Sequence, residues 1–214
     1  MGNDLAALSN KTQRMLKLLD ELYGKADYLD KINFSFTENG STIKVNKDGF
    51  HAVAKAVVEE RILVQTRAAA GPRASVAAGL YSRQFDILFI DKNKIKTKHD
   101  QGVIVHECTH ALGDLQTVQH FTVLSDESVA FLAQTMWLKA ASAPLPTHPD
   151  DPEYNQIFVQ ADMIVTKNKL TEGAHVLLTG ADIVALRSAV KKVYLDVKDD
   201  QRVTDAGVTR AATN

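Results

Sequence analysis

Two histidines four positions apart, within a largely apolar and uncharged segment, constrain the fold of this chain more than any other feature. His106 and His110 belong to the segment from Val103 to Leu112. Residues four positions apart in an α-helix lie one turn apart on the same face, so both imidazoles point the same way. Glu107 is rotated by about 100° from His106 around such a helix. The segment therefore predicts a helix that presents two rings together, with a carboxylate beside them.

Hydrophobic periodicity predicts helices and short strands along the rest of the chain. Alternating residues on either side of Asn39-Gly40, a dipeptide that favours positive φ, predict a β-hairpin over residues 32–45. Further strands are expected at 61–67 and 85–91. Helices are expected at residues 5–22, 48–60, 101–113, 124–140, 153–167 and 180–192. Asp100 is the expected N-cap of the helix that carries the histidines.

Residues 68–80 and 144–152 are expected to be loops, because they contain a Gly-Pro break and four of the five prolines, respectively. The predicted fold class is α+β, with a small mixed sheet packed on the histidine helix and a helical C-terminal part. A length of 214 residues indicates one domain over 1–214. Within it we expect a part with the sheet and histidine helix over 1–112, and a mainly helical part over 113–214.

Composition excludes several classes of protein. Twenty-five basic and 26 acidic residues give a formal charge of -1, which provides no basic excess for nucleic-acid binding. Cys108 is the only cysteine, so it forms no intramolecular disulfide and is expected to be a small buried apolar residue. We find no signal peptide at the first residues and no apolar run of membrane-spanning length. The expectation is a soluble protein, cytoplasmic or exported without a classical signal peptide.

The spacing His-Glu-x-x-His carries a specific chemistry. Two imidazoles on one helical face can bind one Zn²⁺ ion, while the intervening glutamate is placed to act on a water molecule. His106 and His110 are therefore candidate zinc ligands, and Glu107 is the candidate general base for hydrolysis by a zinc-activated water.

Residues 85–127, which contain His-Glu-Cys-Thr-His, resemble the zincin metallopeptidases. The resemblance implies a mixed sheet whose edge strand binds an extended peptide and packs against the active-site helix. Phe85–Ile90 is the segment expected to form that edge strand. It also implies zinc as the cofactor and a peptide or protein as the substrate.

A catalytic zinc needs a third protein ligand. The metzincin pattern places His or Asp where this chain has Gln116, a poor neutral ligand. The gluzincin pattern takes a glutamate from a following helix, and Glu127 fits that pattern. Asp126 and His120 are the alternative ligands.

Other residues are candidates for supporting roles. Asp114 and Asp126 are candidates to accept a ring N–H from a histidine ligand. In gluzincins a downstream Tyr or His stabilises the oxyanion, and Tyr154, His148 and His175 are the candidates here. His51 and His99 are expected at the surface.

The sequence therefore predicts a gluzincin-like zinc metallopeptidase. An alternative is a catalytically inactive zincin-like domain that binds metal or a partner within a larger assembly. A third possibility is a helical scaffold without metal. No feature of the sequence specifies an oligomeric state.

Overall fold

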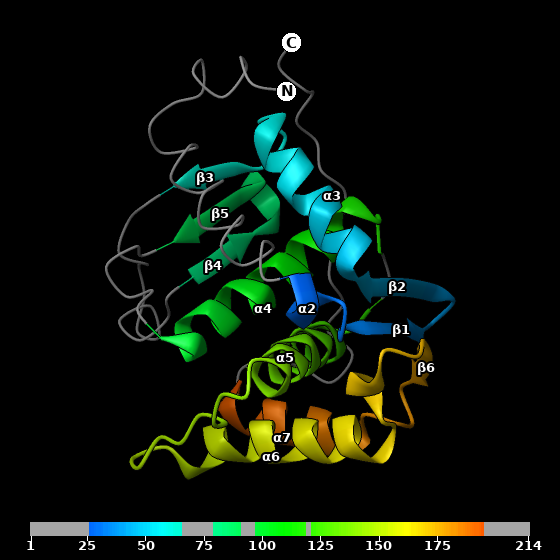
Figure 1. Cartoon of the computed structure of the whole chain (residues 1–214), viewed down its shortest axis with the longest axis vertical. Coiled ribbons are helices and arrows are strands. Elements are labelled where there is room, and N and C mark those ends of the chain that lie inside the picture. The colour runs from blue at the N-terminus through cyan, green and yellow to red at the C-terminus, as the bar shows by residue number, and fades with distance from the viewer. Residues whose placement is uncertain (1–25, 66–78, 91–96, 119–120, 195–214) are drawn as a thin grey trace.

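Two small sheets flank a central pair of helices in the computed structural model, which describes residues 26–65, 79–90, 97–118 and 121–194 (Figure 1). The helices are α2 Ala26–Leu29, α3 Lys47–Val58, α4 Lys98–Leu115, α5 Val123–Ala140, α6 Pro152–Lys167 and α7 Val184–Val193, with short 3₁₀ turns η2 Arg83–Phe85 and η3 Leu170–Glu172. The strands are β1 Asn33–Glu38, β2 Ser41–Asn46, β3 Leu63–Gln65, β4 Gly79–Ser82, β5 Ile87–Ile90 and β6 Val176–Thr179. This mixture confirms the α+β class.

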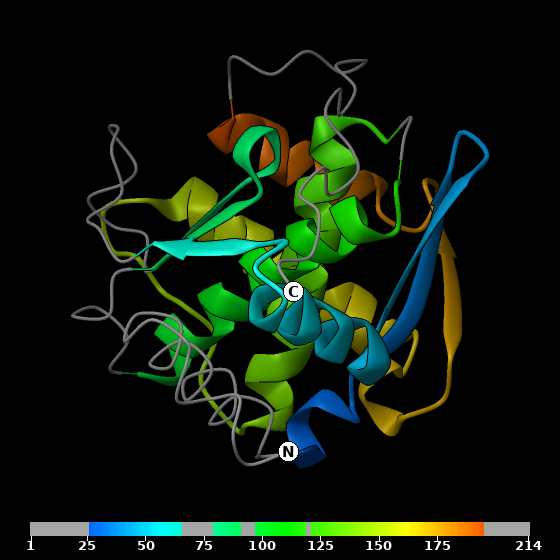
Figure 2. The same ribbon diagram turned by 90° about the horizontal axis from the view of Figure 1, so that it is seen from above.

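The predicted hairpin forms at one side of the molecule. Strands β1 and β2 pair antiparallel, and their two-residue turn has Asn39 and Gly40 at φ 50° and 80°. Positive φ at both positions matches the right-handed twist of the strands, which is why Asn-Gly favours this turn. Strand β6 pairs parallel with β1 on its other edge (Figure 2). Strand β6 therefore pairs with the hairpin although the four helices α3 to α6 separate it from β2 along the sequence.

The second sheet has the order β3-β5-β4, with β5 in the centre. The expectation that Phe85–Ile90 forms the edge strand is therefore wrong. Phe85 belongs to η2 and is 54% exposed, and β5 begins at Ile87. Strand β4 pairs antiparallel with β5 and lies next to α4 (Figure 1). The first two residues of β4 fall in the segment expected to be a loop, whose remaining residues lie outside the described part of the chain.

Helix α4 begins at a capping box. Thr97 Oγ1 accepts a hydrogen bond from the backbone N–H of Asp100, and the Asp100 carboxylate accepts one from the Thr97 N–H. This arrangement satisfies two backbone donors that the helix itself leaves unpaired. Asp100 is thus the third helical residue and not the N-cap. The helix also continues past Gly113 to Leu115. At Gly113 a Cβ would lie 3.2 Å from Arg83 Nη2 and 3.4 Å from Ile43 Cδ1, so glycine suits this close approach.

At the start of helix α5, the carboxylate of Glu38, from the end of β1, binds three residues. It accepts hydrogen bonds from the Thr122 backbone N–H at 2.9 Å, the Ser125 hydroxyl at 2.9 Å and Arg187 Nη1 at 3.2 Å. A negative charge at a helix N-terminus complements the helix dipole. The first β-hairpin, α5 and α7 are therefore joined at one carboxylate.

Helices α6 and α7 cover α5 on the side opposite the β3-β5-β4 sheet (Figure 1). Pro152 occupies the first position of α6, where a backbone N–H would have no partner within the helix, and Asp151 caps the helix. One hydrophobic core includes buried residues from both predicted parts, among them Phe34, Leu88 and Phe158. Among the described residues, no helix has the length and hydropathy that a bilayer span requires. The helix expected at residues 5–22 lies outside the described residues.

Candidate metal centre

His106, His110 and Glu127 converge between α4 and α5. The two histidine Nε2 atoms are 3.2 Å apart, and carboxylate oxygens of Glu127 lie 3.3 Å from the first and 3.7 Å from the second. Their potential ligand atoms all fall within 4.8 Å of one another. Both histidines are buried, and the Glu127 side chain is 18% exposed. This group could hold a metal ion.

The antiparallel packing of α4 and α5 creates the convergence. Gly102 near the start of α4 lies against Leu138 near the end of α5, whereas His110 lies against Asp126 near the start of α5. Since His106 and His110 are one turn apart, both face the first turn of α5, where Glu127 projects. The ring of Phe131, one turn after Glu127, packs edge-on against His106 with centroids 4.5 Å apart.

A chain of polar contacts fixes the orientation of His110. Its Nδ1 is 2.7 Å from Asp126 Oδ2, and the other oxygen of Asp126 accepts a hydrogen bond from Arg83 at 2.7 Å. Arg83 also lies 3.9 Å from Asp114, which accepts a hydrogen bond from the Tyr81 hydroxyl. Of the two predicted acceptors, Asp126 makes the contact with His110, and Asp114 supports it through Arg83.

These contacts change the charges of the site. Burial disfavours a charged His110, but the carboxylates of Asp126 and Glu127 outweigh burial and raise its pKa to about 9. Burial likewise favours the neutral form of Asp126, yet Arg83 and His110 hold its pKa well below the usual range. The pKa of Glu127 is also lowered, because its two histidine neighbours outweigh its burial. These contacts thus favour the ionised forms of Asp126 and Glu127 inside the protein.

Glu107 projects from α4 toward strand β4. Its Oε2 accepts a hydrogen bond of 2.7 Å from the Tyr81 backbone N–H. Gly79, two residues earlier on the strand, leaves room for this side chain, because a Cβ there would lie 3.1 Å from Glu107 Cγ. The strand therefore sets the position of the carboxylate.

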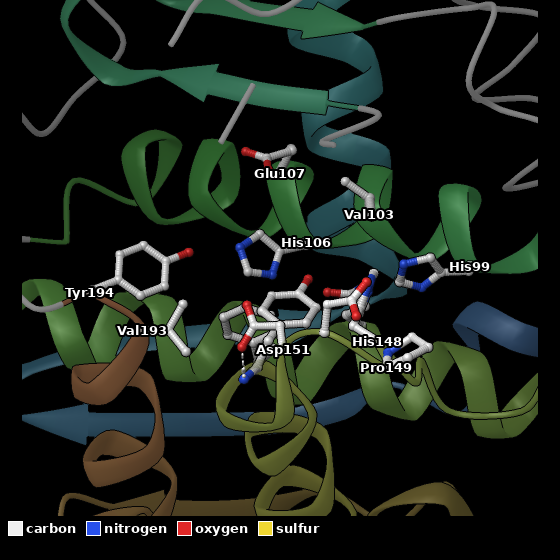
Figure 3. Close-up of a pocket in the computed structure, with 13 residues that line it drawn as sticks. His99, Val103, His106, Glu107, His148, Pro149, Asp151, Val193 and Tyr194 are labelled. Carbon is white, nitrogen blue, oxygen red and sulfur yellow. Dashed lines mark hydrogen bonds between the residues drawn. The ribbon is translucent and has the colours of Figure 1, made fainter. Parts of the chain in front are cut away.

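A pocket of about 380 Å³ opens beside the cluster. Figure 3 shows His106 between Tyr194 at one end of the pocket and His99 at the other. The lining residues come from α4, α5, the proline-rich loop, the start of α6 and the end of α7: His99, Val103, His106, Glu107, Phe131, Gln134, His148, Pro149, Asp150, Asp151, Tyr154, Val193 and Tyr194.

The structure brings two of the three predicted oxyanion donors to this pocket. Tyr154 and His148 line it, with ring centroids 4.9 Å apart. Burial and the carboxylates of Glu107 and Glu127 raise the pKa of Tyr154 to about 12, so its hydroxyl keeps its proton at neutral pH. His175 does not join them: its Nε2 is 2.9 Å from Ser35 Oγ on β1.

Other sequence expectations have mixed outcomes. Cys108 is buried, as predicted, and His51 is exposed. His99 is half-buried and lines the pocket, so the expectation of a surface position is wrong. The alternative ligand His120 lies outside the described residues.

Tyr194 is a site residue that the sequence did not reveal. Its hydroxyl donates a hydrogen bond of 3.1 Å to Glu127 Oε2, across 67 positions of sequence. Burial and the nearby carboxylates raise its pKa well above the usual range, so it remains a donor. Only the docking of α7 against α5 brings it there, and no local pattern encodes that docking.

Comparisons of this chain with known protein families, with curated proteins and with solved structures found no match. The site is therefore interpreted from its own geometry. Two imidazoles and a carboxylate are a donor set that suits a divalent cation, and the adjoining pocket offers room for a ligand beside it.

Proposed function

We propose that this protein is a zinc-dependent metallopeptidase of the gluzincin type. The observation that carries the proposal is the convergence of His106, His110 and Glu127 beside an open pocket. A His₂Glu donor set is one of the sets that bind catalytic zinc, which leaves a further coordination position for water or substrate. Strand β4 lies at the edge of its sheet and next to α4, which supports the proposal that an extended peptide could bind along it.

Zinc bound there would supply Lewis acidity and acidify a water molecule. His106, His110 and Glu127 would hold the ion, with Asp126 fixing the ring of His110 through Nδ1. Glu107 would accept a proton from the attacking water and deliver it to the leaving amine. Tyr154 lines the pocket with a protonated hydroxyl, which could donate a hydrogen bond to a developing oxyanion, whereas the hydroxyl of Tyr194 would hold Glu127.

The variant Glu107→Gln tests this assignment. We expect it to retain one zinc per chain and to lose hydrolysis of an unfolded protein substrate, such as reduced casein, by at least about 100-fold. Zinc content is measured by atomic absorption and hydrolysis by release of fluorescent peptides. His106→Ala is the matched variant that should lose both zinc and hydrolysis.

Two outcomes would contradict the proposal. Full hydrolysis by zinc-loaded Glu107→Gln would remove Glu107 from the mechanism. Stoichiometric zinc in the unmodified protein, with no hydrolysis of any unfolded substrate, would favour the alternative of a metal-binding domain without catalysis.

A further inference from the structure

Two polar atoms at one end of the pocket have no hydrogen-bond partner among the described residues. Gln134 Nε2 is buried on a residue that is only 1% exposed, and His99 Nδ1 is the second such atom. Both residues line the pocket. Leaving a buried polar group unpaired is unfavourable, so such groups are expected to meet a partner in the functional state.

Matched helical faces connect this polar end to the candidate metal centre. On α4, His99 and Val103 continue the face of His106, and on α5 Gln134 continues the face of Glu127 at seven residues. Seven residues of helix correspond to about 10 Å. The polar end therefore lies about 10 Å along the helices from the metal ligands, in the same pocket.

The chemistry of the polar end selects an uncharged group. Gln134 Nε2 needs an acceptor, and the His99 ring can accept or donate through Nδ1. Burial lowers the pKa of His99, so the ring stays neutral at pH 7. The exposed carboxylates of Asp150 and Asp151 at the same pocket disfavour an anionic ligand. A primary carboxamide satisfies these conditions, because it has a carbonyl acceptor and an NH₂ donor.

We propose that Gln134 and His99 form a specificity subsite that binds the carboxamide of a substrate Gln or Asn side chain close to the scissile bond. The inference rests on the proposed peptidase function, which places the substrate backbone at the metal centre. Glutamine is longer than asparagine by one methylene group, so its carboxamide would extend further from the metal centre toward this subsite.

Two peptide hydroxamates that differ only in Gln or Met next to the zinc-chelating group test the subsite. Gln and Met have nearly the same shape, so the comparison isolates the carboxamide. We expect the zinc-loaded protein to bind the Gln compound about tenfold more tightly, as two net hydrogen bonds would give. Gln134→Met should abolish or reverse this preference while its zinc content stays unchanged.

Thr135→Val is the matched control. Thr135 is the next residue of α5, fully buried, with a hydroxyl that also lacks a partner among the described residues, but it does not line the pocket. The tenfold preference should persist in this variant. Equal binding of the two hydroxamates to the unmodified protein would overturn the subsite, since water would then satisfy Gln134 equally well.

A metal-free measurement separates the subsite from the peptidase proposal. In ¹⁵N–¹H spectra of the metal-free protein, millimolar Gln compound should shift the side-chain NH₂ signal of Gln134, identified by its absence in Gln134→Met, and the Met compound should not. A shift in a protein that binds no zinc would support the subsite and contradict the peptidase. Tight but unselective hydroxamate binding, with no such shift, would support the zinc site of the proposed peptidase and contradict the subsite.

Discussion

Asp126 and Glu127 show how two adjacent side chains serve one imidazole. Glu127 lies 3.7 Å from Nε2 of His110, while Asp126 contacts Nδ1 of the same ring at 2.7 Å. Consecutive residues of a helix point about 100° apart, which lets the pair reach both nitrogens. Asp126 in turn depends on Arg83, which neutralises it inside the protein. The orientation of His110 is therefore set before a metal arrives.

Asp126→Asn should weaken zinc binding by about 10- to 100-fold, because the neutral amide no longer polarises His110 and no longer balances Arg83. The dissociation constant is measured by competition with a chromophoric chelator at a temperature where circular dichroism shows the variant folded. Glu153→Gln, an exposed change on α6, should leave the affinity unaltered. An unchanged affinity in Asp126→Asn would show that this carboxylate does not tune the ligand.

At the residue level, the local part of the site could be predicted and the distant part could not. His106, Glu107 and His110 lie within five positions, so helical geometry alone relates them. The prediction of Glu127 as a ligand required only that the next helix turn back and pack against the histidine helix. Along the chain from α5, Tyr194 lies beyond α6 and α7, and His175 lies beyond α6. Nothing in the sequence indicates that α7 brings the first to Glu127 while β6 brings the second to Ser35.

Among the elements, strand β4 controls Glu107. The Tyr81 N–H holds its carboxylate, and the absence of a side chain at Gly79 lets helix and strand approach closely. Strand β4, which ends at Ser82, and helix α4, which begins at Lys98, thus together define the position of one proton acceptor.

Gly79→Ala should therefore lower kcat by about 10- to 100-fold through displacement of Glu107, with zinc affinity unchanged. The added Cβ would lie 3.1 Å from Glu107 Cγ and 3.2 Å from Ile104 Cδ1, so these side chains must move. Leu80→Ala on the same strand is the control, since Leu80 is 44% exposed. Steady-state kinetics on a fluorogenic peptide, together with zinc content, distinguish the two variants; equal kcat in both would contradict this role of β4.

The elements that the sequence predicted well are long or carry strong local signals. Helices α3 and α6 have an amphipathic pattern, α5 is a long segment buried on most of its surface, and Asn39-Gly40 defines the hairpin. Strand β4 was missed because its first two residues belong to a segment expected to be a loop, and β6 was missed because its sequence, Val-Leu-Leu-Thr, shows no alternation of apolar and polar residues. The central position of β5 was also missed, since the order of strands in a sheet depends on distant pairings that local periodicity does not encode.

At the scale of the whole molecule, the candidate ligands join the two helices at the centre of the fold. Because α4 and α5 contribute His106, His110 and Glu127 jointly, unfolding would destroy the site. A metal that binds only the folded chain stabilises it by mass action.

Zinc at 1,000 times its dissociation constant should therefore stabilise the protein by about 4 kcal/mol. For a chain of this size that corresponds to a rise in Tm of about 8–16 °C. Differential scanning calorimetry with zinc and with excess EDTA measures the change. His110→Ala should show the same Tm in both conditions, and a zinc-independent Tm for the unmodified protein would contradict a metal shared by the two helices.

The contacts of Glu38 and Glu127 with residues late in the chain have a consequence for folding during translation. It holds the start of α5 together with Arg187, and Glu127 on that same helix receives the hydroxyl of Tyr194. A nascent polypeptide that does not yet include Arg187 and Tyr194 lacks both contacts, so the groups that support the candidate metal ligands would be incomplete at that stage. The groups around the candidate ligands would thus be complete only after α7 has docked, and a product truncated before α7 would lack both contacts.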